Sequence, residues 1–135
     1  MGTEVAETYT IAQLSNEFGI TPRAIRFYED KSLLAPARQG LSRIYTRRDR
    51  ARLALILRGK RLGFRLDDIK EMLDLYDQGD GQIEQMQFTL ERSRDRIAEL
   101  ERQRRDVDDA IREVKDIVKM IERELVARRA AEKAA

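Results

Sequence analysis

Apolar side chains recur at helical spacing in two short stretches near the start of the chain. Residues 11–18 place them three and four positions apart, and Thr10 can cap this helix through the residue three positions on. Gly19 ends the helix in the left-handed conformation that glycine tolerates. Thr21 then caps a second helix over 22–30, which opens with a proline where the missing N–H costs nothing. The pattern predicts a helix-turn-helix.

Helical spacing fails between residues 31 and 46, where Pro36 and Gly40 interrupt it. The segment "RIYT" after this glycine predicts a short strand and hence a β-hairpin or wing. Thr46, with Asp49 three positions on, is predicted to cap a third helix over 47–62, and Gly63 is predicted to end it. A fourth helix is predicted over 67–76, and "DQGDG" at 77–81 predicts a break. The side chains expected to face the core in these helices are Leu53, Ile56, Leu57, Leu62, Ile69, Met72 and Leu73.

From residue 82 the apolar positions form a sustained heptad repeat, with no proline or glycine to interrupt it. This pattern is typical of a coiled coil, and the ~45-residue helix would be ~70 Å long. A second copy of the chain is the simplest cover for the seam. Packing of the helix on its own N-terminal domain is the alternative. The seam widens near its end, where Ala110 and Ile117 join it. The predicted dimerisation residues are Ile83, Met86, Leu90, Ile97, Leu100, Val107, Ile111, Val114, Val118 and Ile121.

Charge is distributed unevenly along the 135 residues. The net charge of the whole chain is only +2, but residues 22–65 carry 13 Lys and Arg against three acids, a local net charge of +10. A basic segment on a nearly neutral chain indicates an anionic partner. The alternative is a basic face that is merely solvated.

Several kinds of chemistry are excluded by composition. The chain has no cysteine and no histidine. Disulfides, thiolate or imidazole metal sites and Ser–His or Cys–His catalytic pairs are therefore ruled out. Carboxylates are scattered and no phosphate-binding glycine loop is present, so we expect no enzyme activity, no cofactor and no metal. No apolar run approaches the length of a membrane helix, and we expect a cytoplasmic protein.

The second helix of the helix-turn-helix, "PRAIRFYED", carries the candidate chemistry. Arg23 and Arg26 share one face. Phe27 is expected to pack in the core, while Tyr28 is expected to point outward. In such motifs this helix enters the major groove, where arginines contact guanines or phosphates and a tyrosine hydroxyl can reach a phosphate.

The segments "TIAQLSNEFGITPRAIRFYEDKSLLAPAR" and "RIYTRRDRARLALILRGKRLGF" resemble the DNA-binding half of MerR-type bacterial transcription regulators. The resemblance covers about residues 9–128. It implies a mainly α fold, with a winged helix-turn-helix domain over 9–77 and a long antiparallel coiled-coil dimerisation helix over 82–128. The residues that follow the seam predict a flexible tail over 129–135, either solvated or weakly helical. It also implies a homodimer on palindromic promoter DNA. Many members bend and untwist the promoter so that its two RNA polymerase elements align.

The resemblance assigns DNA contacts to matching positions. Arg43 lies on an exposed hairpin with little to pack against, which favours a phosphate contact. For Tyr45, packing under the wing and direct contact are both open. The residues predicted to bind DNA are Thr21, Arg23, Arg26, Tyr28, Arg43, Tyr45, Arg47 and Arg48.

The resemblance has narrower features and departures. "LILRGKRLGF" and "DLYD" are most similar to the subgroup that regulates leucine/isovalerate and related branched-chain or fatty-acid catabolism. Arg65 replaces the usual Ser or Thr cap before the fourth helix and cannot accept a hydrogen bond there. Without cysteine, metal sensing of the family's kind is excluded, and any small-molecule effector is unidentified. The competing function is a coiled-coil adaptor whose basic head binds nucleic acid without sequence preference.

Overall fold

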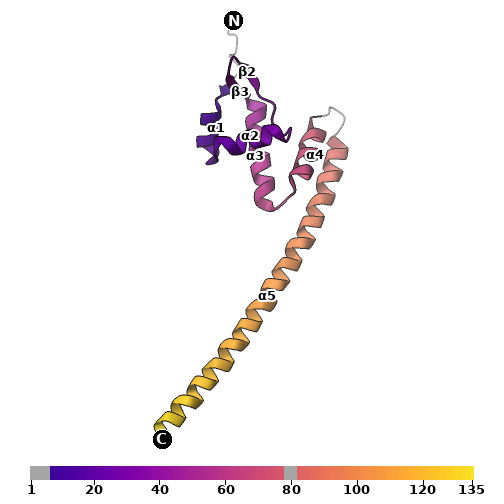
Figure 1. Ribbon diagram of the computed structural model, residues 1–135. Helices are drawn as coiled ribbons and strands as arrows, with labels where there is room; N and C mark the ends of the chain where they lie inside the picture. Colours follow the sequence, from indigo (N-terminus) through magenta and orange to yellow (C-terminus); the bar gives the residue numbers. More distant parts are fainter. Residues whose placement is uncertain (1–6, 78–81) are drawn as a thin grey trace. The chain divides into compact units, whose positions relative to one another are not determined.

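A computed structural model describes residues 7–77 and 82–135 of the chain (Figure 1). Residues 78–81 of the predicted break lie outside the described residues, as do the first six residues. The elements are β1 (Thr8–Tyr9), α1 (Ile11–Phe18), α2 (Pro22–Asp30), β2 (Ala37–Gln39), β3 (Ser42–Thr46), α3 (Arg47–Leu62), α4 (Leu66–Tyr76) and α5 (Gln82–Ala134).

The predicted helix-turn-helix is confirmed together with its caps. The Thr10 hydroxyl accepts from the Gln13 amide at 3.1 Å, and the Gln13 side chain accepts from the Thr10 amide at 2.8 Å. Gly19 follows α1 with a φ of 65°, in the left-handed region that favours glycine. The Thr21 hydroxyl accepts from the Ala24 amide at 3.1 Å and so fixes the start of α2.

The predicted hairpin is confirmed and is part of a three-stranded antiparallel sheet with the order β1-β3-β2. Gly40 has a φ of 64° in the two-residue loop between β2 and β3, as a tight hairpin turn requires. β1, which the sequence did not predict, pairs Tyr9 with Tyr45 of β3. A strand of two residues is too short for alternation to be visible in the sequence.

One hydrophobic core joins helices α1 to α4 with β3, and its buried residues are Leu14, Ile25, Tyr28, Leu33, Leu34, Tyr45, Leu53, Ile56, Ile69 and Leu73. Two expected core residues are corrected: Phe27 is 42% exposed and Leu62 is 44% exposed. Tyr28, expected to point outward, is only 3% exposed. The reason is helical phase, since Tyr28 lies three residues after the buried Ile25 and shares its face.

The capping predictions for α3 and α4 also agree with the structure. Thr46 and Asp49 form a reciprocal capping box at the start of α3, and Gly63 follows this helix with a φ of 87°. Arg65 precedes α4 and supplies no side-chain cap; Asp67 and Asp68 lie in the first turn instead. Their negative charges are favourable at a helix N-terminus.

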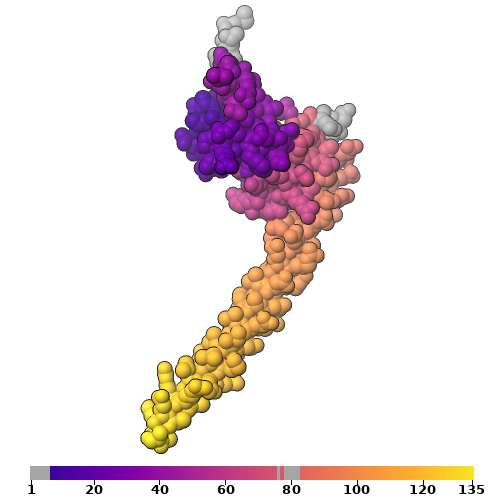
Figure 2. Space-filling view, in the orientation of Figure 1, coloured from indigo at the N-terminus to yellow at the C-terminus, as the bar shows by residue number. Residues whose placement is uncertain are grey.

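The chain divides into two compact units, the first ending at Arg92 and the second spanning Ser93–Ala135. The second unit is a single stretch of helix, and its residues from 97 onward are all exposed (Figure 2). α5 continues through Ala134, so the predicted helix end at 128 is wrong and residues 129–134 belong to the helix. The alanines and long charged side chains of this segment have high helix propensity, and this explains why the helix continues beyond the heptad seam.

Candidate nucleic-acid interface

The outward face of α2 carries two open cations. Arg23 and Arg26 are exposed, and neither forms a hydrogen bond or an ion pair with any other described residue. They lie three positions apart on a helix whose start is fixed by Thr21. Two guanidinium groups on one face of a capped helix can bind an external anion or the acceptor edge of a guanine.

A carboxylate at the end of α2 holds the wing. Glu29 accepts from Nε of Arg43 at 3.0 and 2.9 Å through its two oxygens, and Oε1 also accepts from the Tyr45 hydroxyl at 3.0 Å. The Arg43 and Glu29 side chains are 24% and 11% exposed, and Tyr45 is fully buried. These bonds fix β3 against α2, because both partners of Glu29 lie on that strand.

This arrangement corrects one expectation and decides another. The expectation that Arg43 has little to pack against is wrong, because Glu29 binds its Nε. Its two terminal nitrogens form no hydrogen bond with the described residues, so they can still donate to a phosphate. For Tyr45 the packing alternative is the one observed. Burial, followed by the bond to Glu29, raises the pKa of the Tyr45 phenol, which therefore remains a donor at neutral pH.

The start of α3 adds cations of two kinds. Arg47 is largely exposed, with its Nε 3.7 Å from Glu7, while Arg48 forms an ion pair with Asp77. A surface pair such as the first contributes little to stability, so the Arg47 charge is available to a partner. Arg48 is already engaged on the α4 side.

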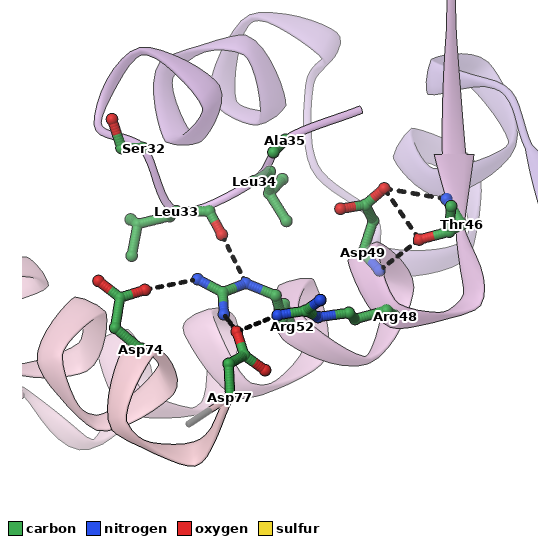
Figure 3. A pocket seen from close by; sticks show the side chains of 10 residues that line it. All are labelled: Ser32, Leu33, Leu34, Ala35, Thr46, Arg48, Asp49, Arg52, Asp74 and Asp77. Carbon is green, nitrogen blue, oxygen red and sulfur yellow. Dashed lines mark hydrogen bonds and ion pairs between the residues drawn. The ribbon is translucent and has the colours of Figure 1, made fainter. Parts of the chain in front are cut away.

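Arg52 connects three parts of the N-terminal head, the region from β1 to α4 (residues 8–76) with Asp77 directly after it (Figure 3). Its side chain is only 12% exposed. Nε donates to the Leu33 carbonyl at 2.9 Å, Nη1 to Asp77 at 2.5 Å and Nη2 to Asp74 at 3.3 Å. Burial alone would raise the pKa of the Asp74 carboxyl, but the hydrogen bonds from Lys70 and Arg52 hold it below its ordinary value. The network fixes the C-terminal end of α4 to the loop after α2.

The sequence interpretation missed the roles of Glu29 and Arg52. The sequence did contain a signal for Glu29, namely its negative charge, since it is one of three acids in a segment with 13 cations. An isolated acid in such a segment has many possible partners, and the sequence does not say which one it meets. For Arg52 no comparable signal exists, because its partners lie 19 to 25 residues away.

If Glu29 positions Arg43, the two residues should act together in DNA binding. We expect Arg43→Ala to weaken binding to all DNA sequences alike. The slope of log affinity against log salt concentration should fall by about one, the effect of losing one phosphate contact. Glu29→Gln keeps an acceptor for Tyr45 but removes the charge that holds Arg43. It should therefore weaken binding in the native protein and change it much less when Arg43 is already alanine. A double-mutant cycle on DNA affinity measures this coupling, and strictly additive effects would contradict it.

The described residues contain no group of three or more metal-binding side chains. Nor does any of their helices have the length and apolar character needed to cross a membrane. What the geometry offers is a recognition helix with open arginines, a wing fixed to it and further cations at the start of α3. These features define a winged helix-turn-helix DNA-binding protein.

Comparison with known families identifies the chain further. Residues 9–75 match the family model "MerR HTH family regulatory protein", and residues 50–117 match "MerR, DNA binding". The chain belongs to the MerR family of DNA-binding transcription regulators.

Individual relatives match about half of the chain. An uncharacterized HTH-type transcriptional regulator of Pseudomonas aeruginosa, PA4778, is 40% identical over 68 residues, which are 49% of this chain and 52% of PA4778. The HTH-type transcriptional regulator CueR of Salmonella typhimurium is 32% identical over 68 residues, 49% of each chain. The matched region thus spans about half the length of these relatives.

Solved structures extend the likeness along more of the chain. HiNmlR, a MerR family regulator lacking the sensor domain and bound to promoter DNA, is 27% identical with a TM-score of 0.60, covering 76% of this chain and 80% of that one. The N-terminal part of the Bacillus subtilis multidrug transporter activator, MtaN, is 27% identical with a TM-score of 0.61, covering 82% and 97%. Both likenesses agree with the observed winged helix-turn-helix fold.

Proposed function

We propose that this regulator acts as a homodimer that binds a palindromic promoter operator in the bacterial cytoplasm. The open arginine face of α2 carries the proposal, because Arg23 and Arg26 have no partner among the described residues and occupy the helix that enters the major groove in such motifs. The exposed heptad seam of α5 supports the homodimer, since a seam of this length requires a cover.

Each contact residue has a proposed role. Arg23 and Arg26 contact base edges or bind phosphates of the DNA. The Thr21 hydroxyl can donate to a DNA phosphate while its oxygen accepts from the Ala24 amide and caps α2. Arg43, held by Glu29, and the exposed Arg47 bind flanking phosphates. Tyr28, Tyr45 and Arg48 support this surface from behind through packing and the ion pair to Asp77.

Arginine substitutions on α2 test the sequence-reading role. We expect Arg23→Ala or Arg26→Ala to cost about 1–3 kcal/mol of binding free energy if the residue contacts a guanine, and to relax preference at one base pair. The measurement is affinity for the operator and for random DNA at one fixed salt concentration. Arg105→Ala, which removes an exposed cation of α5, is the control and should preserve the ratio of the two affinities. Equal affinity for both DNAs in the native protein would favour a nonspecific coiled-coil adaptor instead.

We further propose that the dimer distorts its operator, which would let it align promoter elements for RNA polymerase. Two heads related by a two-fold axis must meet half-sites about 34–36 Å apart, or a multiple of this, on straight DNA. Wings that grip the flanks can offset the ~1–6 kcal/mol that bending such a site costs. Fluorescence transfer between labels at the two operator ends measures the bend, and straight DNA in the complex would contradict this part of the proposal.

The regulated genes are inferred from sequence likeness alone. "LILRGKRLGF", from the second half of α3 to Phe64, and "DLYD", at the end of α4 and just after it, support membership of the subgroup that controls branched-chain or fatty-acid catabolism. Both segments lie in the first of the two compact units. The assignment is tested by measuring transcription of catabolic genes of this kind that lie next to the regulator's own gene, with and without the regulator.

A further inference from the structure

The seam of α5 contains two polar residues that can set its register. Its apolar members are about half exposed in the single chain, from Ile83 to Leu125. At two seam positions the repeat carries Ser93 and Arg104 instead. A polar residue at a seam position costs stability in a coiled coil, but it selects one register over others.

We infer that α5 pairs with a second copy in the antiparallel register that places Ser93 opposite Arg104 of the other chain. The inference rests on the proposed homodimer and specifies how its two helices align. The two-fold axis then crosses the seam between the Ile97 and Leu100 layers, midway along the helix between the two polar positions. The serine hydroxyl can accept from the guanidinium group, and its small size leaves room for the arginine stem.

Apart from the layer of Ser93 with Arg104, the layers around this axis are apolar. Each layer occurs twice by symmetry, and the successive pairs outward from the axis are Ile97 with Leu100, Ser93 with Arg104, Leu90 with Val107, Met86 with Ile111, and Ile83 with Val114. A shift by one heptad in either direction separates the two polar residues. It sets Arg104 against Leu100 or Met86, where the charge has no polar partner in the seam.

The flanking charges favour the same register. Arg94 and Glu101 both follow seam positions directly, and each lacks an ion pair within the described residues. In the inferred register Arg94 of one chain lies beside Glu101 of the other, twice per dimer. The registers one heptad away bring either Arg94 beside its own copy or Glu101 beside its own copy, and like charges repel.

The register also explains why the seam widens. The partner's α5 begins at Gln82, which in this alignment lies level with Lys115. Apolar residues beyond that point, such as Ile117 and Ile121, extend past the start of the partner's helix. They must be covered by another part of the second copy, which is consistent with a broader stripe there.

Engineered disulfides test the register directly, because the chain contains no cysteine of its own. Ser93→Cys combined with Arg104→Cys should form disulfide-linked dimers on mild oxidation. Within one helix these positions are ~16 Å apart, far beyond the roughly 4.4–6.8 Å between Cα atoms that a disulfide spans, so any bond is intermolecular.

Three control variants report the competing alignments. Ser93→Cys with Ile111→Cys, and Met86→Cys with Arg104→Cys, would crosslink in the two registers one heptad away. Ser93→Cys alone would crosslink in a parallel pair. We expect linked dimers on a non-reducing gel from the first pair and little from the controls. Crosslinking of a control at an equal or higher rate would overturn the inference.

Sedimentation and a charge exchange complete the test. Native protein that sediments as a monomer would contradict the homodimer itself, whereas a dimer that crosslinks in another register would contradict only the alignment. Arg94→Glu should weaken the dimer roughly tenfold, and adding Glu101→Arg should restore it. Weakening that the second substitution fails to reverse would count against the pairing of these residues.

Discussion

Replacing Ile97 and Leu100 with glutamate should leave the chain monomeric and unable to hold an operator with two half-sites. Both side chains lie on the exposed seam of α5, at 55% and 42% exposure in the single chain. Burying one such side chain contributes about 1.5–3 kcal/mol, and the double substitution removes four of them from a dimer while placing four carboxylates in its interface. Sedimentation gives the oligomeric state, and operator titration gives the affinity.

A control separates loss of pairing from loss of helix. Ala98→Glu adds one carboxylate per chain one position round the helix from Ile97, away from the seam, and should leave the dimer and its DNA affinity nearly unchanged. The doubly substituted chain should retain a folded head, because the core residues lie before α5. Dimers that persist with both glutamates in place would show that the seam is not the interface.

Arg52→Ala should give the largest loss of stability among single substitutions of the head's arginines. The substitution leaves Asp74, Asp77 and the Leu33 carbonyl without their common donor. We expect the free energy of unfolding to fall by about 2–4 kcal/mol, less than for a fully buried pair because Asp74 is partly exposed. Urea denaturation measures the change. Arg50→Ala removes an exposed pair with Glu17 and is the matched control, with little change expected.

The same substitution should alter the acid sensitivity of the head. The pKa of Asp74 is lowered in the fold, so its contribution to stability is present above the ordinary aspartate value, near 3.9, and is lost as pH falls below it. Arg52→Ala removes one cause of the lowered pKa. The difference in unfolding free energy between native protein and variant should therefore shrink as the pH falls below about 4. A difference independent of pH in this range would contradict the assigned role of Asp74.

Local signals in the sequence predicted the helices and their ends well. Thr10, Thr21 and Thr46 each cap a helix through the residue three positions on, and the glycines at 19 and 63 adopt the positive φ expected after a helix. These features depend on neighbours within one turn, so a single sequence contains all the information they require.

Features that depend on distant partners were less predictable. The orientation of Phe27 and Tyr28 depends on which face of α2 packs against the core. The two residues are neighbours at the edge of that face, so the sequence alone does not decide which one is buried. The pairing of Arg43 with Glu29 joins a strand to a helix across 14 residues. Sequence alone indicated a basic surface but not which cations the fold itself neutralises, and this distinction separates Arg23 and Arg26 from Arg48 and Arg52.

The exposed seam of α5 has a consequence for how a promoter would respond to the amount of regulator. If the apolar seam is buried only by a second copy, the species that binds DNA is a dimer. While monomers predominate, the dimer concentration rises with the square of the monomer concentration. Halving the supply of protein in that regime would cut the dimer about fourfold. A gene controlled through this interface would then respond to regulator dosage more steeply than in direct proportion.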